Sequence, residues 1–252
     1  MQFSVLTLNL HGTIDRWLDR RELIVAGFVD RQPDIIAFQR ANFWGGQVQW
    51  LMRQTHTRVG ERLYRGVQRR HRGLGSLFDG VAILSKYPIV YYETLSLPEK
   101  RTALLLNVEL PSGDTVDIVN CHLISGVRLP EVRYQQVMEL TGWLSIPGRS
   151  PFQVIAGGLN DVPESRTIKR MKQRYGSAWE TAHGHEPIAT WPTALGGQFP
   201  SWTGCLDYLF ATSNLSVNNA RMFGNEIHPE DETLFMSDHV GIEASFTLDK
   251  VV

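Results

Sequence analysis

Asp238 and His239 form an ionisable pair directly before an alternating apolar run near the C-terminus, a pattern that predicts a strand. A carboxylate and an imidazole at the mouth of a strand suit phosphate chemistry, because the carboxylate can hold a hard cation while the imidazole donates to an anionic oxygen. The same pair is also typical of a turn residue beside a solvated histidine. The other strand ends therefore decide between these two interpretations.

Several other apolar runs also end in polar side chains. Asn9 closes the run over residues 3–10, and Arg40 closes the run over residues 34–40. In chain order, the polar residues at predicted strand ends are Asn9, Arg40, Asp79, Asn120, His122, Asn160, Asp207, Asp238 and His239. Their number favours a common function over a set of isolated turns.

The spacing of apolar residues predicts the elements that must position these side chains. Apolar runs predict strands over residues 3–10, 34–40, 79–84, 89–97, 101–110, 115–123, 152–156 and 205–210, with one more after His239. Helical spacing predicts helices over residues 15–32, 42–55 and 129–144, and a basic helix that opens at residues 163–165. We therefore expect nine or ten strands and four or five helices, with a tryptophan-rich loop over residues 191–202.

The balance of strands and helices predicts an α/β fold in which a two-sheet β-sandwich is flanked by helices. The sequence has no repeat period and no linker-like stretch, so we expect a single domain over residues 1–252. A domain of this size buries about 70–75% of its unfolded surface and needs no disulfide or structural metal. The composition, 42% hydrophobic and 20% charged, is that of an ordinary globular protein and excludes disorder.

Charge and cysteine content limit the classes of partner. With 25 basic and 26 acidic residues the net charge is -1, so any contact with a polyanion must be local. Cys121 and Cys205 lie in or beside apolar runs, which favours buried, reduced thiols. We see no leader peptide and no apolar run of membrane-spanning length, so we expect a cytoplasmic monomer without an obligate protein partner.

The most basic stretch of the chain is a candidate phosphate contact. It contains Arg58, Arg62, Arg65, Arg69, Arg70 and Arg72, opposed only by Glu61. We expect it to be a loop, because glycines close the segment. Two interpretations stay open: a solvated arginine surface, or a loop that contacts phosphate groups.

Seven short motifs resemble those of the endonuclease/exonuclease/phosphatase superfamily, which includes DNase I. They are Leu-Thr-Leu-Asn-Leu, Ile-Ile-Ala-Phe-Gln, Gly-Val-Ala-Ile-Leu-Ser-Lys-Tyr-Pro-Ile, Asn-Cys-His-Leu, Ala-Gly-Gly-Leu-Asn-Asp, Leu-Asp-Tyr-Leu-Phe and Ser-Asp-His. They span positions 6 to 239 and occur in the order of the family. Each motif is degenerate, but seven in register are highly specific for the fold.

This resemblance implies a four-layer α/β/β/α, DNase I-like fold with a Mg²⁺ or Mn²⁺ site at one edge, where water attacks phosphorus. It implies that Asn9 supports the metal or the phosphate and that Asp238 lies on the metal side. By the same resemblance, the groups that donate to phosphate oxygens are His122, Asn160 and His239. Asp207 would orient His239 through a hydrogen bond, and Asp79 by its position would do the same for His122.

Two positions depart from the pattern of the family. Arg40 stands where the family has the glutamate that is the main metal ligand, and Gly158 stands where it has the aspartate that orients or deprotonates water. The two changes make the pocket about three charge units more positive, which disfavours a dication. Arg40 either takes the place of the metal as a fixed monocation or turns out to solvent.

Two functional hypotheses follow from the resemblance and these departures. The first is a metal-dependent phosphoesterase, acting on phosphodiesters or phosphomonoesters, whose activity is impaired. The second is a phosphate-binding pseudoenzyme or inactivated variant that binds without turnover. The substrate is a phosphate ester, either a nucleic acid or an inositol phosphate. The residues expected to bind it are Arg69, Arg70, Arg72, Arg101 and Trp191.

Overall fold

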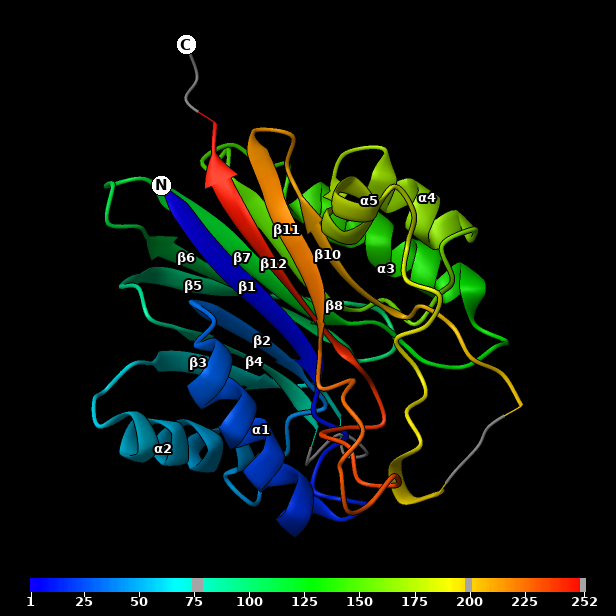
Figure 1. Cartoon of the computed structure of the whole chain (residues 1–252). Helices are drawn as coiled ribbons and strands as arrows, with labels where there is room; N and C mark the ends of the chain where they lie inside the picture. The colour runs from blue at the N-terminus through cyan, green and yellow to red at the C-terminus, as the bar shows by residue number, and fades with distance from the viewer. Residues whose placement is uncertain (74–78, 198–200, 250–252) are drawn as a thin grey trace.

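The computed structural model describes residues 1–73, 79–197 and 201–249, which form two six-stranded sheets packed face to face (Figure 1). The first sheet has the order β11-β12-β1-β2-β4-β3 and contains β1 (Gln2–Asn9), β2 (Ile35–Gln39), β3 (Arg65–Arg70), β4 (Gly80–Ser85), β11 (Leu215–Phe223) and β12 (Gly241–Leu248). The second has the order β5-β6-β7-β8-β10-β9 and contains β5 (Ile89–Ser96), β6 (Thr102–Glu109), β7 (Thr115–His122), β8 (Gln153–Gly158), β9 (Gly176–Ser177) and β10 (Asp207–Ala211).

Helices cover the outer face of each sheet (Figure 1). The first sheet packs against α1 (Trp17–Arg31) and α2 (Gln47–Val59), and the second against α3 (Pro130–Trp143) and α4 (Arg166–Lys172). A short helix, α5 (Ala178–His183), contacts β10 and β11. The expected α/β sandwich with flanking helices is therefore confirmed. None of the helices among the described residues is long and apolar enough to cross a membrane.

The period of two in β1 explains why this strand is buried on both faces. Phe3 and Val5 point into the core between the two sheets, whereas Leu6 and Leu8 point into the core under α1 and α2. A strand that alternates between two apolar layers has no solvent face, so it reads as a continuous apolar run.

The topology brings the predicted strand ends to one end of the sandwich. β2 runs parallel to β1, and β8 runs parallel to β7, so these four strands finish at the same edges of their sheets. β10 and β12 run antiparallel to β8 and β1 and therefore begin there. A buried amide pair links the two sheets at this end: Nε2 of Gln39 donates to Oδ1 of Asn120 over 2.8 Å.

The expected number of strands was too low, and the basic segment is not a loop over its whole length. The structure adds β3, β9 and β11 to the nine runs recognised by their apolar residues. β3 contains Arg65, Arg69 and Arg70 and pairs with β4 at the edge of the first sheet. An edge strand needs only one paired side, and charged side chains there prevent association with other strands, so β3 lacks the apolar pattern of a central strand.

Candidate active site

His239 is held by a carboxylate from the second sheet. Its Nδ1 lies 2.7 Å from Oδ2 of Asp207, and the same oxygen accepts a 2.7 Å hydrogen bond from the hydroxyl of Thr190. Burial lowers the pKa of His239, but the charge and hydrogen bond of Asp207, helped by Asp238, outweigh burial and raise it. The hydrogen bond expected between Asp207 and His239 is therefore present, and it favours the imidazolium form.

Beside this pair, a histidine that the sequence did not single out bridges two carboxylates. Nε2 of His11 lies 2.7 Å from Oδ2 of Asp15, and its Nδ1 lies 2.9 Å from Oδ2 of Asp238. Nη1 of Arg40 lies 3.3 Å from the same Nδ1. Burial raises the pKa of Asp238, but the hydrogen bond from His11 and the charges of His239, His11 and Arg40 hold it at about 2. Asp238 is therefore an ionised carboxylate at neutral pH, with His11 as its direct partner.

A buried arginine fixes the loop that carries His11. Arg20 in α1 is 0% exposed and donates to five backbone carbonyl oxygens, those of Leu10, Gly12, Ile14, Asp15 and Met236. Four of these lie in the loop between β1 and α1, and the fifth lies two residues before Asp238. Burial lowers the pKa of Arg20 to about 10, so the side chain stays charged at neutral pH.

His122 ends β7 and faces Gly158 at the end of the neighbouring strand. A Cβ placed on Gly158 would lie 3.6 Å from Nε2 of His122 and 3.3 Å from Oδ1 of Asp207. A side chain at position 158 would therefore stand between these two residues. The side-chain amide of Asn160, which the resemblance assigns to phosphate, donates instead to the carbonyl oxygen of Leu123 over 2.8 Å.

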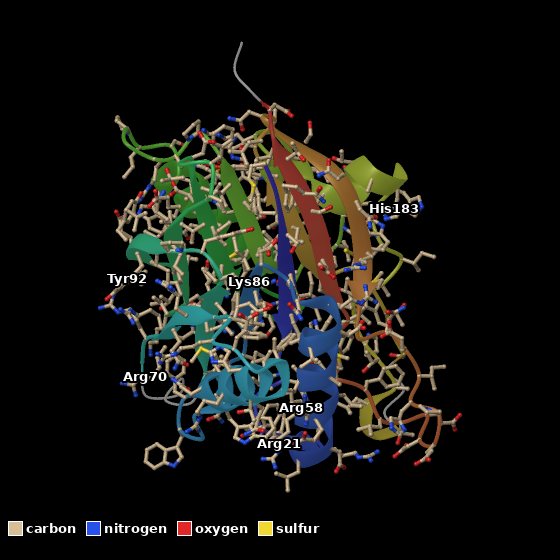
Figure 2. The ribbon with its side chains drawn as sticks, turned by 60° about the vertical axis from the view of Figure 1, so that its left-hand side comes forward. Arg21, Arg58, Arg70, Lys86, Tyr92 and His183 are labelled. Atoms are coloured by element: carbon tan, nitrogen blue, oxygen red, sulfur yellow. The ribbon has the colours of Figure 1, made fainter. Side chains whose placement is uncertain are left out.

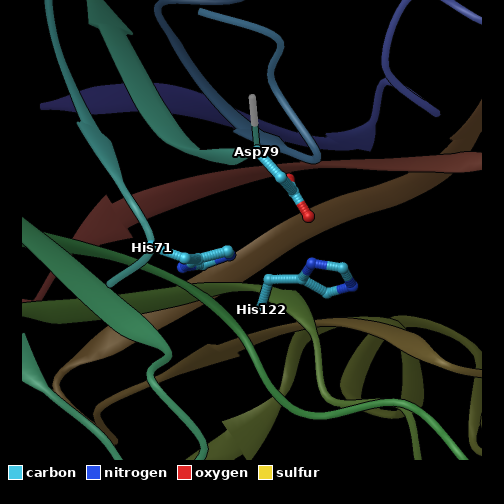
Figure 3. A group of neighbouring side chains, drawn as sticks. All are labelled: His71, Asp79 and His122. Carbon is cyan, nitrogen blue, oxygen red and sulfur yellow. The ribbon is translucent and has the colours of Figure 1, made fainter. Parts of the chain in front are cut away.

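The other edge of His122 belongs to a cluster with His71 and Asp79 (Figure 3). Each of the three residues offers a nitrogen or carboxylate oxygen, and these atoms lie within 4.8 Å of one another. No direct hydrogen bond joins Asp79 to His122, because Oδ1 of Asp79 and Nδ1 of His122 are both buried without a partner among the described residues. The expected direct pairing of Asp79 with His122 is therefore wrong. Oδ2 of Asp79 lies 3.9 Å from Arg101 instead.

The two histidines of this cluster are neutral. Burial, and then the charge of Arg101, lower the pKa of His71 to about 3. Burial lowers the pKa of His122 well below its usual range, and the nearby charges of Arg101, His71, His239 and Arg40 lower it further. Burial also raises the pKa of Asp79, against the opposite effect of Arg101 and Arg40. The surroundings of this cluster therefore lower the pKa of its histidines, whereas the surroundings of His239 raise its pKa.

The five residues expected to bind substrate fall into two groups. Arg101 faces Asp79, and the ring of Trp191 lies 6.4 Å from that of His239, so both adjoin the polar strand ends. Arg69 and Arg70 lie on the edge strand β3, and the guanidinium of Arg69 stacks 4.5 Å above the ring of Tyr92. Figure 2 shows Arg70 and Tyr92 on the same side of the molecule. Arg72 donates to the hydroxyl of Ser96.

Comparison with known proteins identifies the family. The sequence pattern described as Endonuclease/Exonuclease/phosphatase family matches residues 6–239. The chain belongs to this family. No curated protein matches it in sequence.

Solved structures of other members have the same fold. An endonuclease/exonuclease/phosphatase from Bacteroides vulgatus is 15% identical, with a TM-score of 0.79 over 99% of this chain and 100% of that one. D. rerio TDP2 complexed with single-strand DNA product is 19% identical, with a TM-score of 0.81 over 98% of this chain and 99% of that one. The human Nocturnin catalytic domain with bound sulfate anion is 19% identical, with a TM-score of 0.79 over 98% and 93% of the two chains.

The residues present do not fit the divalent metal that the family resemblance implies. Oδ1 of Asn9 accepts the backbone N–H of His11 at 3.0 Å, and Arg40 stands at the position of the family glutamate. Oδ2 of Asp238 is engaged by His11 at 2.9 Å. The hydroxyl of Ser237 lies 3.2 Å from Oδ1 of Asp238 but donates its one hydrogen to the carbonyl oxygen of Asn9 at 2.6 Å. A hard dication needs several free oxygen ligands, and this part of the site offers few of them and places the charge of Arg40 beside them.

Sequence reasoning missed His11, His71 and Arg20. His11 directly follows the first strand motif, two residues after Asn9, and this position was a usable signal. His71 lies inside the basic segment, between Arg70 and Arg72, where the pattern indicates a surface or a phosphate contact rather than a buried histidine. Arg20 lies between Asp19 and Arg21 in α1, and its burial depends on a loop that wraps around its side chain. No sequence pattern distinguishes it from a surface arginine.

Proposed function

We propose that this chain binds phosphate esters at the polar strand ends, and that it hydrolyses them far more slowly than a family member with both catalytic carboxylates. In this proposal His239, as an imidazolium, and His122, as a neutral donor, contact the phosphate oxygens. Arg101 adds a positive charge near them, and Asn160 contributes its remaining amide N–H. The alternative, metal-dependent turnover at a normal family rate, requires ligands that positions 40 and 158 do not supply.

One observation carries the proposal: Nδ1 of His11 lies 2.9 Å from Oδ2 of Asp238 and 3.3 Å from Nη1 of Arg40, in the region where the family resemblance puts the metal. His11 contacts the carboxylates of Asp15 and Asp238, and Arg40 adds a positive charge beside them. A phosphate group can still be attracted by the remaining histidines and arginine, because anions need donors and positive charge rather than oxygen ligands. Binding is therefore retained in this proposal, whereas generation of hydroxide by a metal is not.

A nucleic acid is the substrate class that we favour. The TDP2 structure is described with a single-strand DNA product, and the Nocturnin domain with a sulfate anion, which is chemically similar to phosphate. Trp191 beside His239 is suited to stacking on a base. β3 supplies arginines for a phosphate backbone. An inositol phosphate would use the same donors but would not need the aromatic side chain.

Restoration of the two carboxylates tests the proposal. We expect Arg40→Glu to recover Mg²⁺ binding with little turnover, because water still lacks its orienting aspartate. The double variant Arg40→Glu/Gly158→Asp should raise turnover by roughly 10²–10⁴ for each group restored. The backbone at position 158 allows a side chain, since its φ is not in the left-handed region, unlike that of Gly157 with φ 144°. A Cβ there would lie 3.1 Å from Cδ2 of His122, so the His122 ring must shift slightly to accommodate it.

Calorimetric titration with Mg²⁺ and Mn²⁺, and turnover of single-stranded DNA, RNA and a chromogenic phosphodiester, are the measurements. Arg40→Gln/Gly158→Asn is the matched control, because it has nearly the same shapes without the negative charges. Tight Mg²⁺ binding by the unmodified chain would contradict the proposal. A double variant no faster than its amide control would show that other groups limit the reaction.

A further inference from the structure

Three buried polar atoms face one another beside His122 without a protein partner. They are Nε2 of His71, Oδ1 of Asp79 and Nδ1 of His122 (Figure 3). A buried polar atom without a hydrogen bond costs about 1–3 kcal/mol. Two of these atoms come from the connection between β3 and β4 and the third from the end of β7 in the other sheet, and their grouping indicates a built feature rather than a packing defect.

The backbone determines where the hydrogen of His71 lies. The N–H of Thr102 donates to Nδ1 of His71 over 3.1 Å, so Nδ1 carries a lone pair and no hydrogen. A neutral imidazole has one N–H, and it must then be on Nε2. Of the three unpartnered atoms, Nε2 of His71 is therefore a donor, and Oδ1 of Asp79 is an acceptor when the carboxylate is ionised.

This arrangement of hydrogens does not suit a metal ion, although the residue types would. A metal on Nε2 of His71 needs the lone pair of that nitrogen, while the lone pair of Nδ1 is already used by Thr102. Metal-bound histidines instead donate an N–H from their second nitrogen. Arg101, 3.9 Å from Asp79, adds a positive charge at the same place.

One water molecule satisfies all three atoms. Water can accept the N–H of His71 and donate one hydrogen to Asp79 and the other to Nδ1 of His122. His71, Asp79 and His122 each offer one nitrogen or carboxylate oxygen within 4.8 Å of those of the other two, and three atoms that close together have a common point about 2.8 Å from each. That distance is the usual length of a hydrogen bond to water, and buried waters make about three such bonds.

We propose that His71 is a positioning residue which, with Asp79 and a bridging water, keeps Nδ1 of His122 as an acceptor and its hydrogen on Nε2. This arrangement would aim the neutral N–H of His122 at a phosphate oxygen. Only that purpose rests on the proposed function. Nε2 of His122 is on the edge that faces Gly158 and Asp207, where a phosphate would lie between the two sheets. If the hydrogen were on Nδ1, Nε2 would present a lone pair to the anion and repel it.

Nitrogen NMR of the unliganded full chain tests this assignment directly. The chemical shifts and long-range proton couplings of the His122 ring distinguish a hydrogen on Nε2 from one on Nδ1. We expect the Nε2–H form at pH 7. A hydrogen on Nδ1 in the unmodified chain would overturn the proposal, and so would stoichiometric binding of Zn²⁺ that shifts the rings of His71 and His122.

Two substitutions at His71 separate a positioning role from a merely structural one. His71→Asn keeps an oxygen near the site of Nδ1 for the Thr102 N–H but is too short to reach the water. His71→Gln reaches the position of Nε2 with an amide N–H. We expect the Nδ1–H form of His122 to increase at least tenfold relative to the Nε2–H form in His71→Asn, and the normal ratio to return in His71→Gln. An unchanged ratio in a folded His71→Asn would overturn the role of His71.

Titration with inorganic phosphate distinguishes this inference from the proposed function. We expect the affinity for inorganic phosphate to fall roughly three- to tenfold in His71→Asn, because one neutral hydrogen bond contributes about that much. The affinity should recover in His71→Gln. If phosphate does not shift the His239 and His122 signals of the unmodified chain, the proposed function fails. The tautomer of His122, which is measured without phosphate, would still decide the inference about His71.

Discussion

The site has two halves, and the pKa of the central histidine is raised in one and lowered in the other. On the His239 side, which comprises His11, Arg40, Asp207, Asp238 and His239, the hydrogen-bonded carboxylates offset most of the positive charge at distances of 2.7–2.9 Å. On the His122 side, which comprises His71, Asp79, Arg101 and His122, three polar atoms are buried without a protein partner. Direct contact with Asp207 raises the pKa of His239 and favours its imidazolium form, whereas burial beside Arg101 lowers the pKa of His122 and keeps it neutral.

The difference shows that a histidine near a carboxylate need not form a charged pair with it. Asp207 lies within hydrogen-bond distance of His239, so its charge outweighs the cost of burial. Asp79 is shared with Arg101 and has no direct bond to His122, so burial dominates there. A phosphate between the two sides would meet one charged and one neutral N–H donor. Such a site attracts an anion without accumulating two buried cations.

The largest expected effect comes from breaking the direct pair. Asp207→Asn removes the charge that raises the pKa of His239, while the burial that lowers this pKa remains. We expect the pKa of His239 to fall below that of the unmodified chain, and turnover of the Arg40→Glu/Gly158→Asp variant to fall by about 10²–10⁴. NMR titration of His239 and the turnover assay are the measurements.

Asp79→Asn is the matched change on the His122 side. We expect a much smaller loss of turnover, roughly tenfold, because Asp79 acts on His122 only across the cluster. If Asp79→Asn were as damaging as Asp207→Asn, the proposed distinction between the two sides would not hold.

The next effect concerns the arginine that positions the His239 side. Arg20→Met removes the donors to five backbone carbonyls and leaves them buried. We expect the free energy of unfolding to fall by roughly 3–5 kcal/mol, as for other broken buried charge networks. Urea unfolding measures this loss. Arg20→Lys, which keeps the charge with fewer donors, should be intermediate, and a loss below about 1 kcal/mol for Arg20→Met would show that the loop does not depend on Arg20.

A smaller effect uses pH. The pKa of His71 is lowered to about 3 and that of His122 is lowered well below its usual value, so the unfolded chain binds protons at these residues before the folded chain does. Stability should therefore fall as pH drops from about 6.5 toward 3, by up to about 1.4 kcal/mol per pH unit for each histidine. His239 has a raised pKa and acts in the opposite sense: its contribution is present below pH 6.5 and is lost as pH rises through its folded pKa.

Urea unfolding at pH 7, 6 and 5 checks this sign. His71→Gln does not titrate in this range, so its stability should depend on pH less steeply than that of the unmodified chain. An equal slope for the two proteins would mean that His71 is protonated as easily in the folded state as in the unfolded state.

Much of the fold could be predicted because it depends on local apolar patterns. The alternation of residues 3–10 predicts a central strand, and β1 is buried on both faces. The motifs around Asp207 and His239 predicted a direct pair, since each residue lies next to a regular strand that fixes its position. β3 was missed because an edge strand can be polar, and Leu18 in α1 is 65% exposed although its spacing is that of a core residue.

The finer parts of the site depend on contacts that no local pattern encodes. Arg20 is buried because a loop and a distant segment place their carbonyl oxygens around it. The pairing of Asp79 with His122 was predicted from order along the chain, but a difference of about an ångström decides whether a carboxylate bonds to an imidazole. The role of His71 depends on a single backbone N–H, that of Thr102. These contacts join residues that are far apart in sequence, so no local pattern predicts them.

The smallest expected effect separates arginines at the site from arginines on the edge strand. Arg101 is 15% exposed and adjoins Asp79 and the neutral histidines, whereas Arg70 lies on β3 and is exposed. Arg101→Gln should weaken binding of inorganic phosphate roughly three- to tenfold and raise the pKa of His122, because the charge of Arg101 lowers it. Arg70→Gln should leave phosphate binding unchanged. It should instead weaken the binding of a single-stranded oligonucleotide. The slope of log affinity against log salt concentration should fall by about 0.7, the value for one phosphate contact. Phosphate titration followed by NMR, and oligonucleotide binding at several salt concentrations, measure the two effects. Equal effects of both substitutions on the binding of inorganic phosphate would show that the edge strand β3 also belongs to the phosphate site.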